Sequence, residues 1–522
     1  MSGIETEVVI AGAGPTGLAL ACELALAGVE TLVLDRLPHR LRQVKGGALQ
    51  PRTSELLEMR GLLEPMQRRA LPREAVGSHF ALLPVPLDCS PWQTRHPYPI
   101  SIPQWEIEEV LEDHAASLGA RVLRGVPVTG VTTEDGTDGG VTVTADAGLA
   151  VRARYLVAAD GAHSTVRKLL GLPFPGRPGT YQAVLADIRL CSTSPQVPKR
   201  IAHISEMTRK APGYWAMLVP VGGDRYRLTF GRMGDAAGHT DDARDTPVTD
   251  QEIADALHAV YGPATELGGV DNSSRFTDAT RQLGHYRAGG RVLFAGDAAH
   301  IHPPFGGQGL NTGVQDAFNL GWKLAAAVQG RAPDGLLDTY HAERHPVGAQ
   351  VLQVTSAQRV LATTEPGSDE AALAAIFTEL MRRPDTNRYL AGLMSGLSLS
   401  YDLPGDHPLT GQRVPDADLV IDAGLVLATD DATGRERTRL SALLAAGHAV
   451  LLDLAGVIPP GTCLPPRVDH VRVTCADGLP AAALLLRPDG YACWAADDQA
   501  TALATLGTAL SRVTSATPTR DH

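Results

Sequence analysis

Two short apolar runs with a helical segment between them open the chain. Residues 7–11 (EVVIA) and 30–35 (ETLVLD) are rich in β-branched residues, which is typical of strands buried on both faces. Between them, GAGPTG is followed by LALACELALAG, which has the length and composition of a helix and ends at Gly28. This order predicts a β-turn-α-β unit, and such units form parallel sheets with right-handed crossovers.

Two other patterns follow further along the chain. Apolar and polar positions alternate in AVLADIRL, YWAMLVPV and YRLTFGR between residues 181 and 231, which predicts a sheet with one covered face. Two more buried strands, in YLVAADG and VLFAGD, end at Asp160 and Asp297, and we expect helices over 107–118, 309–328 and much of 339–383. The sequence therefore predicts the α/β class.

A second unit is expected after a boundary near residues 385–415. That stretch contains SYDLPGDHPLTGQRVPDADL, which is rich in Pro, Gly and Asp and has little periodicity. Beyond it, LSALLAAGHAVLLDLAG predicts a helix and then a strand, and ALLLRPDGYACWAADD predicts a strand, a turn and a strand.

Composition narrows the functional classes. Of 522 residues, 44% are hydrophobic and 20% charged, as in ordered globular proteins. The net charge of −12 and the 5% aromatic content argue against a nucleic-acid or membrane partner. No apolar run is long enough to span a bilayer and no secretory signal is visible, so we expect a cytoplasmic protein. Without CxxC, HExxH or Cys/His ligand spacing, we expect free thiols and no metal.

The turn after the first strand carries a dinucleotide-binding pattern. Gly12, Gly14 and Gly17 form GxGxxG between a strand and a helix. In this pattern the first glycine permits a tight turn, the second lets a pyrophosphate approach the backbone, and the third lets the helix pack on the sheet. Asp35 at the end of the next strand would accept hydrogen bonds from a ribose.

Two later strand ends carry an acid beside a glycine. Asp160-Gly161 and Gly296-Asp297 are each expected at the carboxyl edge of a sheet, where open α/β sheets bind ligands. A turn or helix-cap role is the alternative for either aspartate.

The segment PPFGGQGLN combines a rigid residue with flexible ones. Pro304 fixes the backbone, Gly306, Gly307 and Gly309 permit close approach, and we expect a helix to begin near Leu310. Its N–H groups and dipole would then face an anion. The alternative is an ordinary helix start in a loop.

These three motifs, in this order, resemble those of the class A flavoprotein monooxygenases, the FAD-dependent aromatic hydroxylases. The resemblance covers residues 5–350 well and the C-terminal unit more loosely. It implies a Rossmann-like FAD-binding domain of the p-hydroxybenzoate hydroxylase type, interleaved with a β-sheet substrate domain and followed by a thioredoxin-like α/β domain that lacks the redox CxxC. The corresponding ranges are 1–75, 100–175 and 275–385 for the FAD domain, 76–99 and 176–274 for the substrate domain, and 400–522 for the thioredoxin-like domain.

The resemblance also assigns cofactor contacts. The ADP portion of FAD would lie on the first motif and Asp35, the ribityl chain against Gln104 and Asp297, and the flavin edge on the PPFGGQGLN segment. At a position often held by Arg, this chain has Lys45, which keeps the charge but not the planar fork, so Arg42 or Arg52 could compensate. The implied cofactor-binding residues are Gly12, Gly14, Pro15, Thr16, Gly17, Asp35, Arg36, Lys45, Gln104, Asp160, Gly161, Gly296, Asp297, Pro304, Gly306, Gly307, Gly309, Leu310 and Asn311.

The family's reaction sets the functional hypothesis. NADPH or NADH would reduce FAD, and O2 would then give a C4a-hydroperoxide that hydroxylates a polycyclic aromatic, polyketide-type substrate. Rifampicin-type drug modification and Baeyer–Villiger insertion are alternatives, as is a non-catalytic flavin-binding sensor. A halogenase lacks support because its Trp-x-Trp-x-x-Ile signature is absent. We expect a monomer or homodimer.

The sequence alone assigns no catalytic base. A phenol could be activated by Tyr, His or Arg near the ring, but each candidate has packing or surface exposure as its alternative. The candidates in the expected substrate domain and its surroundings are Arg73, His79, His96, Tyr98, His203, Tyr214, Trp215 and Tyr226.

Overall fold

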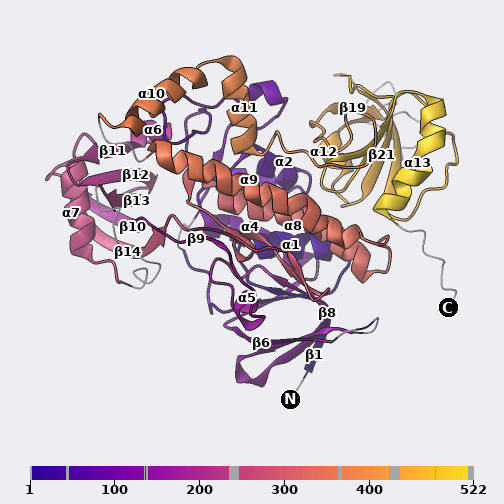
Figure 1. Cartoon of the computed structure of the whole chain (residues 1–522), viewed down its shortest axis with the longest axis horizontal. Helices are drawn as coiled ribbons and strands as arrows, with labels where there is room; N and C mark the ends of the chain where they lie inside the picture. The colour runs from indigo at the N-terminus through magenta and orange to yellow at the C-terminus, as the bar shows by residue number, and fades with distance from the viewer. Residues whose placement is uncertain are drawn as a thin grey trace.

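Three large sheets organise the part of the chain that the structure describes. The computed structural model describes residues 3–42, 46–134, 136, 139–233, 246–362, 367–421, 436–475 and 478–514. An antiparallel sheet lies at the left of Figure 1, a mixed sheet at the lower centre, and the C-terminal unit at the right. Long helices run between them.

The mixed sheet is built around the first strand of the chain. Its strands are β1 (Gly3–Ala11), β2 (Thr31–Asp35), β5 (Arg121–Arg124), β6 (Val128–Thr133), β7 (Val141–Ala145), β8 (Ala150–Ala158), β16 (Arg287–Ala288) and β17 (Val292–Phe294). The order β16-β17-β8-β1-β2-β5 places β1 between two parallel partners, with β7 and β6 added beside β8. Val8, Val9 and Ile10 are fully buried, as the continuous apolar run predicted.

Three helices cover this sheet and pack closely on one another. They are α1 (Pro15–Leu26), α4 (Gln104–Ser117) and α8 (Gln308–Val328). Where α1 meets α8, a Cβ on Gly321 would lie 2.4 Å from the Cβ of Glu23, so only glycine allows this approach. The Cys22 thiol donates to the Leu111 carbonyl of α4 at 3.2 Å. The predicted helices over 107–118 and 309–328 therefore form, each beginning slightly earlier than expected.

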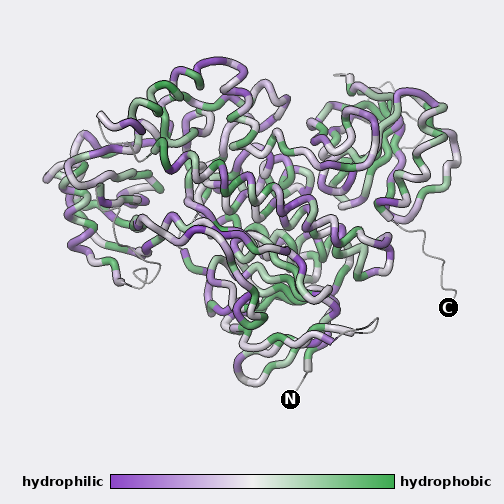
Figure 2. The backbone as a smooth tube through the Cα atoms, in the orientation of Figure 1, coloured by the Kyte–Doolittle hydropathy of each residue, from purple (hydrophilic) through white to green (hydrophobic). Residues whose placement is uncertain are grey.

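The antiparallel sheet confirms the prediction made from alternating residues. Its strands, in the order β11-β12-β13-β10-β14, are β10 (Gln182–Ser192), β11 (Thr208–Ala211), β12 (Tyr214–Gly222), β13 (Arg225–Arg232) and β14 (Glu266–Thr277). Ala186, Ile188, Leu218 and Leu228 from alternate positions form a core against α7 (Asp250–Tyr261). Figure 2 shows the mixture of apolar and polar positions that this one-sided burial requires.

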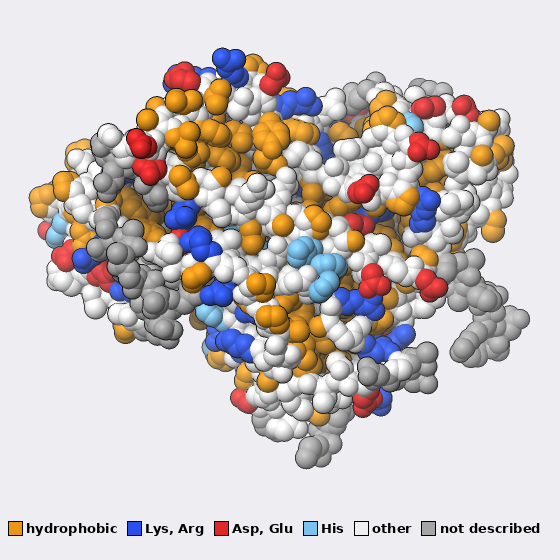
Figure 3. Space-filling view, in the orientation of Figure 1, with side chains coloured by type: hydrophobic (Ala, Val, Ile, Leu, Met, Phe, Trp, Pro, Cys, Tyr) orange, Lys and Arg blue, Asp and Glu red, His pale blue; other side chains and the backbone are white. Residues whose placement is uncertain are grey.

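Helices α9 (Thr339–Ala362), α10 (Asp369–Met381) and α11 (Pro384–Ser395) follow α8. They form a separate apolar cluster with residues 80–89, a stretch from the range predicted for the substrate domain. Leu373, Ile376 and Leu380 of α10 are exposed, and hydrophobic side chains gather over this helix in Figure 3. The boundaries of the FAD and substrate domains stay a prediction.

Short elements connect the main layers. They are β3 (Ala48–Leu49), β4 (Ile100–Ser101), β9 (Gly176–Arg177), β15 (Thr280–Gln282), β18 (His300–Ile301), α2 (Pro51–Glu58), α3 (Leu63–Gln67), α5 (Thr165–Leu169) and α6 (Ile204–Met207). β3 pairs with β4, and β15 pairs with β9 and β18. No helix among the described residues is long and apolar enough to cross a membrane.

The C-terminal unit has the predicted α/β arrangement. Its elements are β19 (Asp418–Ile421), β20 (Glu436–Arg439), α12 (Leu440–Leu443), β21 (Ala449–Asp453), β22 (Val468–Cys475), β23 (Ala483–Leu486), β24 (Ala492–Ala496) and α13 (Gln499–Val513). Parallel β21 and β22 are extended by antiparallel β23 and β24, and the apolar side of α13 joins this core. This arrangement fits the predicted thioredoxin-like domain.

The turn between β23 and β24 fixes this unit to the rest of the protein. Arg487 forms two hydrogen bonds of 2.9 Å with the Glu343 carboxylate of α9 and also pairs with Asp489. From α2, Arg52 donates to the Asp489 carbonyl at 2.7 Å. Burial alone would raise the pKa of Glu343, but Arg487 and Lys323 lower it to about 2. The RPDG turn therefore connects the C-terminal unit to α9 and α2 through buried ionic and hydrogen-bonded contacts.

Replacing Arg487 with Met should destabilise the protein strongly. The variant leaves the buried carboxylates of Glu343 and Asp489 short of a partner, which typically costs about 3–5 kcal/mol of unfolding free energy. Arg382→Met breaks an exposed pair with Glu379 and should cost about 1 kcal/mol or less. Urea unfolding of both variants measures the difference. Equal losses of unfolding free energy would contradict a stabilising role of the RPDG contacts.

Candidate active site

Four strand ends bring the predicted motifs to one edge of the mixed sheet. Ala11 of β1 pairs with Leu34 of β2 and with Ala158 of β8, and Ala158 also pairs with Phe294 of β17. The segments that follow these strands are GAGPTG, Asp160-Gly161 and Gly296-Asp297, with Asp35 at the end of β2. The motifs are far apart in sequence, but parallel pairing makes them neighbours.

The glycines of GAGPTG have three different environments. A Cβ on Gly12 (φ +105°) would lie 2.4 Å from the Ala159 carbonyl oxygen, and one on Gly17 would lie 2.0 Å from the Gly12 carbonyl oxygen. Gly14 has an ordinary φ of −83°, and a Cβ there would meet no atom within 4 Å. Gly12 and Gly17 are thus required by packing, whereas Gly14 borders open space at the N-terminus of α1.

Thr16 packs closely against two other segments, the turn at Gly296 and the helix α8 at Gly313. A Cβ on Gly296 (φ +60°) would lie 2.6 Å from the Thr16 hydroxyl oxygen, and one on Gly313 of α8 would lie 2.2 Å from it. Pro15 occupies the first turn of α1, where the N–H that proline lacks would have no partner within the helix. Gly313 was missed from the sequence because it follows the GGQGLN segment in an ordinary helical pattern.

Asp35 holds the glycine turn. Its carboxylate accepts hydrogen bonds from the N–H groups of Ala13 (2.7 Å) and Leu37 (2.8 Å). Each carboxylate oxygen has a second lone pair, so the half-buried group can still accept a ribose hydroxyl. Arg36, the next residue, is exposed.

Asp160 accepts hydrogen bonds from the start of α5 through one oxygen, while Ser164 is the N-cap of that helix. Its Oδ2 accepts from the N–H groups of Thr165 (2.6 Å) and Val166 (3.1 Å) at the start of α5, as the helix-cap alternative proposed. Its Oδ1 is buried and has no hydrogen-bond partner among the described residues. Burial raises the pKa of Asp160, although Ser164 and the N–H groups oppose this. Gly161 (φ +83°) borders open space.

The side chains of Asp297 and His302 both approach Gly309 in the first turn of α8. A Cβ on Gly309 would lie 3.5 Å from the Asp297 Oδ1 and 3.7 Å from the His302 Nε2, so these polar groups face the same space. Asp297 is exposed. Burial lowers the pKa of His302 to about 4, so the ring is neutral, and its Nε2 has no partner within the described part of the chain.

The PPFGGQGLN segment differs from its prediction in two details. Pro304 precedes a short 3-10 turn over Phe305–Gly307, and α8 begins at Gln308 rather than near Leu310. A Cβ on Gly306 (φ +74°) would lie 2.1 Å from the Met394 methyl group, so the absence of a side chain here lets α11 approach. Gly307 (φ +62°) borders open space. Close approach at Gly306 is therefore made by α11.

Two amides tie this segment to the region before α2. Asn311 accepts from the Gln50 backbone N–H at 2.8 Å and donates to the Ala48 carbonyl at 3.0 Å. The Gln50 side chain donates to the Gly306 carbonyl at 2.9 Å, while its buried Oε1 has no partner among the described residues. The sequence contained no signal for Gln50.

Gln104 and Leu310 border the same region at Gly46. The Gly46 N–H donates to the Gln104 Oε1 at 3.0 Å, and a Cβ on Gly46 would lie 3.2 Å from the Leu310 side chain. Lys45 lies outside the described residues. Arg52 cannot compensate for it, because it is buried against Glu55 at 2.9 Å, while Arg42 stacks over Trp105 at 5.0 Å.

Three of the eight candidate bases come together. Arg73 forms a β-bridge with Ile201, and burial lowers the pKa of His79 to about 3, with further lowering by His203 and Arg73. The Nε of Arg73 and the Nε2 of His203 are buried without a hydrogen-bond partner in the described ranges. Gln50 lies 3.5 Å from Ser78, next to His79, so this cluster adjoins the Gly306 contact.

The other five candidates lie elsewhere or have partners of their own. His96 pairs with Glu58 at 2.5 Å, Tyr98 is exposed, and the Trp215 indole donates to the Tyr181 hydroxyl. Tyr214 and Tyr226 belong to strands β12 and β13 of the antiparallel sheet.

The polar groups at the sheet edge, both donors and acceptors, fit an FAD molecule. Gly14 and the N-terminus of α1 offer space and N–H groups for a pyrophosphate, and Asp35 offers acceptors for a ribose. The buried atoms of Asp160, His302 and Gln50 that have no partner among the described residues offer further hydrogen bonds. No group of three metal-ligating side chains occurs among the residues described.

Comparison with known proteins gives two family matches. Residues 5–355 match the FAD binding domain model, and residues 407–517 match the model of the aromatic-ring hydroxylase C-terminal domain. The first match alone spans more than half of the chain.

Similar proteins match over nearly their whole length. A 12-dehydrotetracycline 5-monooxygenase/anhydrotetracycline 6-monooxygenase of Streptomyces rimosus is 44% identical over 504 residues, covering 94% of this chain and 95% of the relative. A rifampicin monooxygenase of Streptomyces venezuelae is 40% identical, with 94% and 96% covered. The solved structure of the anhydrotetracycline hydroxylase OxyS from Streptomyces rimosus is 42% identical, with a TM-score of 0.83 and 98% and 99% covered.

Replacing Gly14 with Ala should weaken FAD binding without destabilising the protein, whereas replacing Gly17 with Ala should destabilise it. Gly14→Ala adds a methyl group to open space and should leave the unfolding free energy of the apoprotein within about 0.5 kcal/mol. It should weaken FAD binding about tenfold or more, because the methyl group occupies the space for the pyrophosphate. Gly17→Ala clashes with the Gly12 carbonyl and should destabilise the apoprotein itself. Thermal unfolding and fluorescence titration with FAD separate the two, and unchanged FAD affinity in Gly14→Ala would refute the assignment.

Proposed function

The chain belongs to the FAD-dependent aromatic-ring hydroxylases, and on that premise we propose that it hydroxylates a polycyclic aromatic polyketide. It is an FAD-dependent monooxygenase. In the proposed reaction, substrate, O2, NADPH or NADH and one proton give the hydroxylated product, water and oxidised nicotinamide. One observation carries the proposal: Gly14, Asp297 and the start of α8 lie together at one sheet edge. The buried cluster of Arg73, His79 and His203 lies beside them.

The residues of the sheet edge would hold FAD in one orientation. The N–H groups of α1 beside Gly14 would bind the pyrophosphate, and Asp35 the ribose. Asp297 and Gln104 would contact the ribityl chain. When bound, FAD supplies hydride acceptance from the nicotinamide and activation of O2.

Helix α8 would provide the electrostatic part of catalysis. It has 21 residues and begins after Gly307, where a Cβ would meet no atom within 4 Å. The first N–H groups of a helix have no partner within the helix. This positive end would stabilise negative charge that develops on the adjacent edge of the flavin ring. Buried side chains around Gly306, including Met394 and Gln308, would keep water from the ring.

Arg73, His79 and His203 would bind the polar edge of the substrate. Burial keeps His79 neutral, and it also lowers the pKa of His203, so both rings can exchange hydrogen bonds with phenol or enol oxygens. The Arg73 guanidinium would stabilise an ionised oxygen, which makes the aromatic ring more electron-rich. The names of the relatives suggest a tetracycline precursor as the substrate, with a rifampicin-like drug as the second candidate.

The remaining proposals concern the protein as a whole. We propose a cytoplasmic monomer or homodimer with the three domains assigned from the sequence. The C-terminal domain would have a structural role, since its cysteines, like the others described, are free thiols.

Turnover with isotopically labelled O2 tests the reaction. The FAD-loaded enzyme with NADPH and anhydrotetracycline should give a product that carries one labelled oxygen atom by mass spectrometry, and rifampicin should be tried in parallel. NADPH oxidation that yields only hydrogen peroxide with every polycyclic phenol would contradict the proposal.

Arg73→Gln tests the substrate cluster. Loss of a charged hydrogen bond should raise KM about tenfold or more while FAD affinity stays unchanged, because Arg73 is assigned to the substrate and not to the cofactor. Arg68→Gln is the matched control, since Arg68 pairs with Glu64 on the surface. An equal KM in both variants would remove Arg73 from the substrate site.

A further inference from the structure

Helix α10 is apolar on two sides, and one of these sides is packed inside the chain. On the inner side, Ala374 and Met381 are buried, and Phe377 stacks on Phe80 with ring centroids 5.3 Å apart. The helix is therefore held in place by the apolar cluster that it shares with residues 80–89 and α11. The second apolar side is exposed, and in Figure 3 hydrophobic side chains gather over this part of the surface.

The exposed side of α10 is a regular stripe of large apolar residues. Leu373, Ile376 and Leu380 are 50%, 61% and 41% exposed, and their spacing places them on one face of the helix. Asp369 continues this alternating spacing of four and three residues toward the N-terminus, and Arg383 continues it just beyond the C-terminal end. The same spacing forms the contact seam between two packed helices. A contiguous apolar surface with charged residues at its rim is typical of a protein contact site.

The charges at the two ends of the stripe determine which partner fits it. Asp369 and Arg383 are both exposed, and each lies seven residues, about two helical turns, from Ile376. If a second copy of α10 crosses antiparallel at Ile376, Asp369 of each copy lies beside Arg383 of the other. A parallel crossing would bring like charges together instead. The stripe is therefore complementary to itself about a two-fold axis, as the interface of a symmetric homodimer requires.

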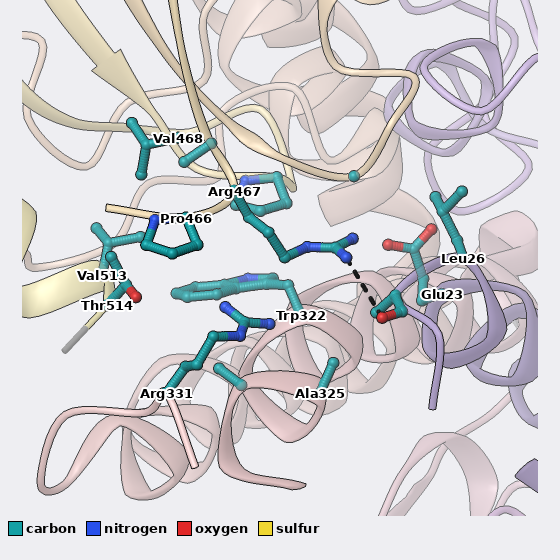
Figure 4. Close-up of a pocket in the computed structure, with 15 residues that line it drawn as sticks. Glu23, Leu26, Trp322, Ala325, Arg331, Pro466, Arg467, Val468, Val513 and Thr514 are labelled. Atoms are coloured by element: carbon teal, nitrogen blue, oxygen red, sulfur yellow. Dashed lines mark hydrogen bonds between the residues drawn. The ribbon is translucent and has the colours of Figure 1, made fainter. Parts of the chain in front are cut away.

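The apolar contact between α8 and the C-terminal unit, by contrast, is made within one chain. Figure 4 shows Trp322 of α8 with Pro466 and Arg467 on one side of its ring and Arg331 on the other. Trp322 packs against the apolar core of the C-terminal unit, and Arg467 donates to the Ala27 carbonyl of the α1 end at 3.3 Å. This side of the C-terminal unit is already covered by its own chain, whereas the large side chains of the α10 stripe face solvent.

We propose that the α10 stripe, formed by Leu373, Ile376 and Leu380 with Asp369 and Arg383 at its ends, is the contact face of a homodimer. Two copies of the helix pack antiparallel, with Ile376 at the two-fold axis and an Asp369–Arg383 ion pair at each end of the contact. A single helix of 13 residues is smaller than a standard interface of about 800 Å2 per partner, so we expect a dimer that dissociates on dilution. The proposal concerns assembly and does not depend on the substrate or the reaction.

Sedimentation velocity of the FAD-loaded enzyme over a concentration series measures the association. We expect the wild type to show a monomer–dimer equilibrium. Ile376→Asp removes apolar contact and places two carboxylates at the two-fold axis, so the dissociation constant should rise about tenfold or more. Leu503→Asp is the matched control, because Leu503 of α13 is 62% exposed and lies outside the stripe. A wild type that stays monomeric up to millimolar concentration, or equal dissociation constants in the two variants, would overturn the proposal.

Charge reversal tests the antiparallel arrangement. Asp369→Arg or Arg383→Asp alone places like charges at both ends of the contact and should raise the dissociation constant several-fold. The double variant restores opposite charges and should return the constant close to the wild-type value. Asp369→Arg also disfavours the dipole of α10, but this effect on stability persists in the double variant and so cannot mimic the rescue. A double variant that associates as weakly as the single variants would contradict the antiparallel contact.

Discussion

The structure depends on three places where no side chain fits. A Cβ at Gly12, Gly17 or Gly313 would lie within 2.4 Å of the Ala159 carbonyl, the Gly12 carbonyl or the Thr16 hydroxyl, respectively. These contacts bring α1, α8 and the ends of β1 and β8 to one edge of the sheet. Because two helix N-termini then face the same region, their dipoles polarise the edge positively. An anionic dinucleotide with an electron-accepting ring suits such an edge.

The sequence predicted the main frame because its signals are local. Continuous apolar runs indicated the buried strands, alternation indicated the antiparallel sheet, and glycine spacing indicated the first turn. Parallel pairing then made the convergence of the motifs a geometric consequence. The details that no local pattern predicts depend on tertiary contacts: Met394 packs against Gly306, and Arg52 is buried toward the C-terminal unit. Gln50 and the cluster of Arg73, His79 and His203 come from separate segments that no local pattern connects.

Helix α8 extends from the sheet edge that carries the motifs to the contacts of the C-terminal unit. Its first turn borders the flavin edge, its middle contributes Asp316, and its last turns carry Trp322 and Lys323. Burial alone would raise the pKa of Asp316, but Arg344 and His300 lower it, so a charged carboxylate stays in the interior. The same carboxylate accepts the Gly296 N–H at 3.1 Å.

A crystal structure of the FAD complex would show whether the four strand ends bind one cofactor. We expect the pyrophosphate at the N-terminus of α1 beside Gly14, and the flavin ring against Gly307 and the start of α8. We also expect Asp297 to accept a hydrogen bond from the ribityl chain. An FAD molecule located away from the carboxyl edge of β1, β8 and β17, or a protein that takes up no FAD, would contradict this placement.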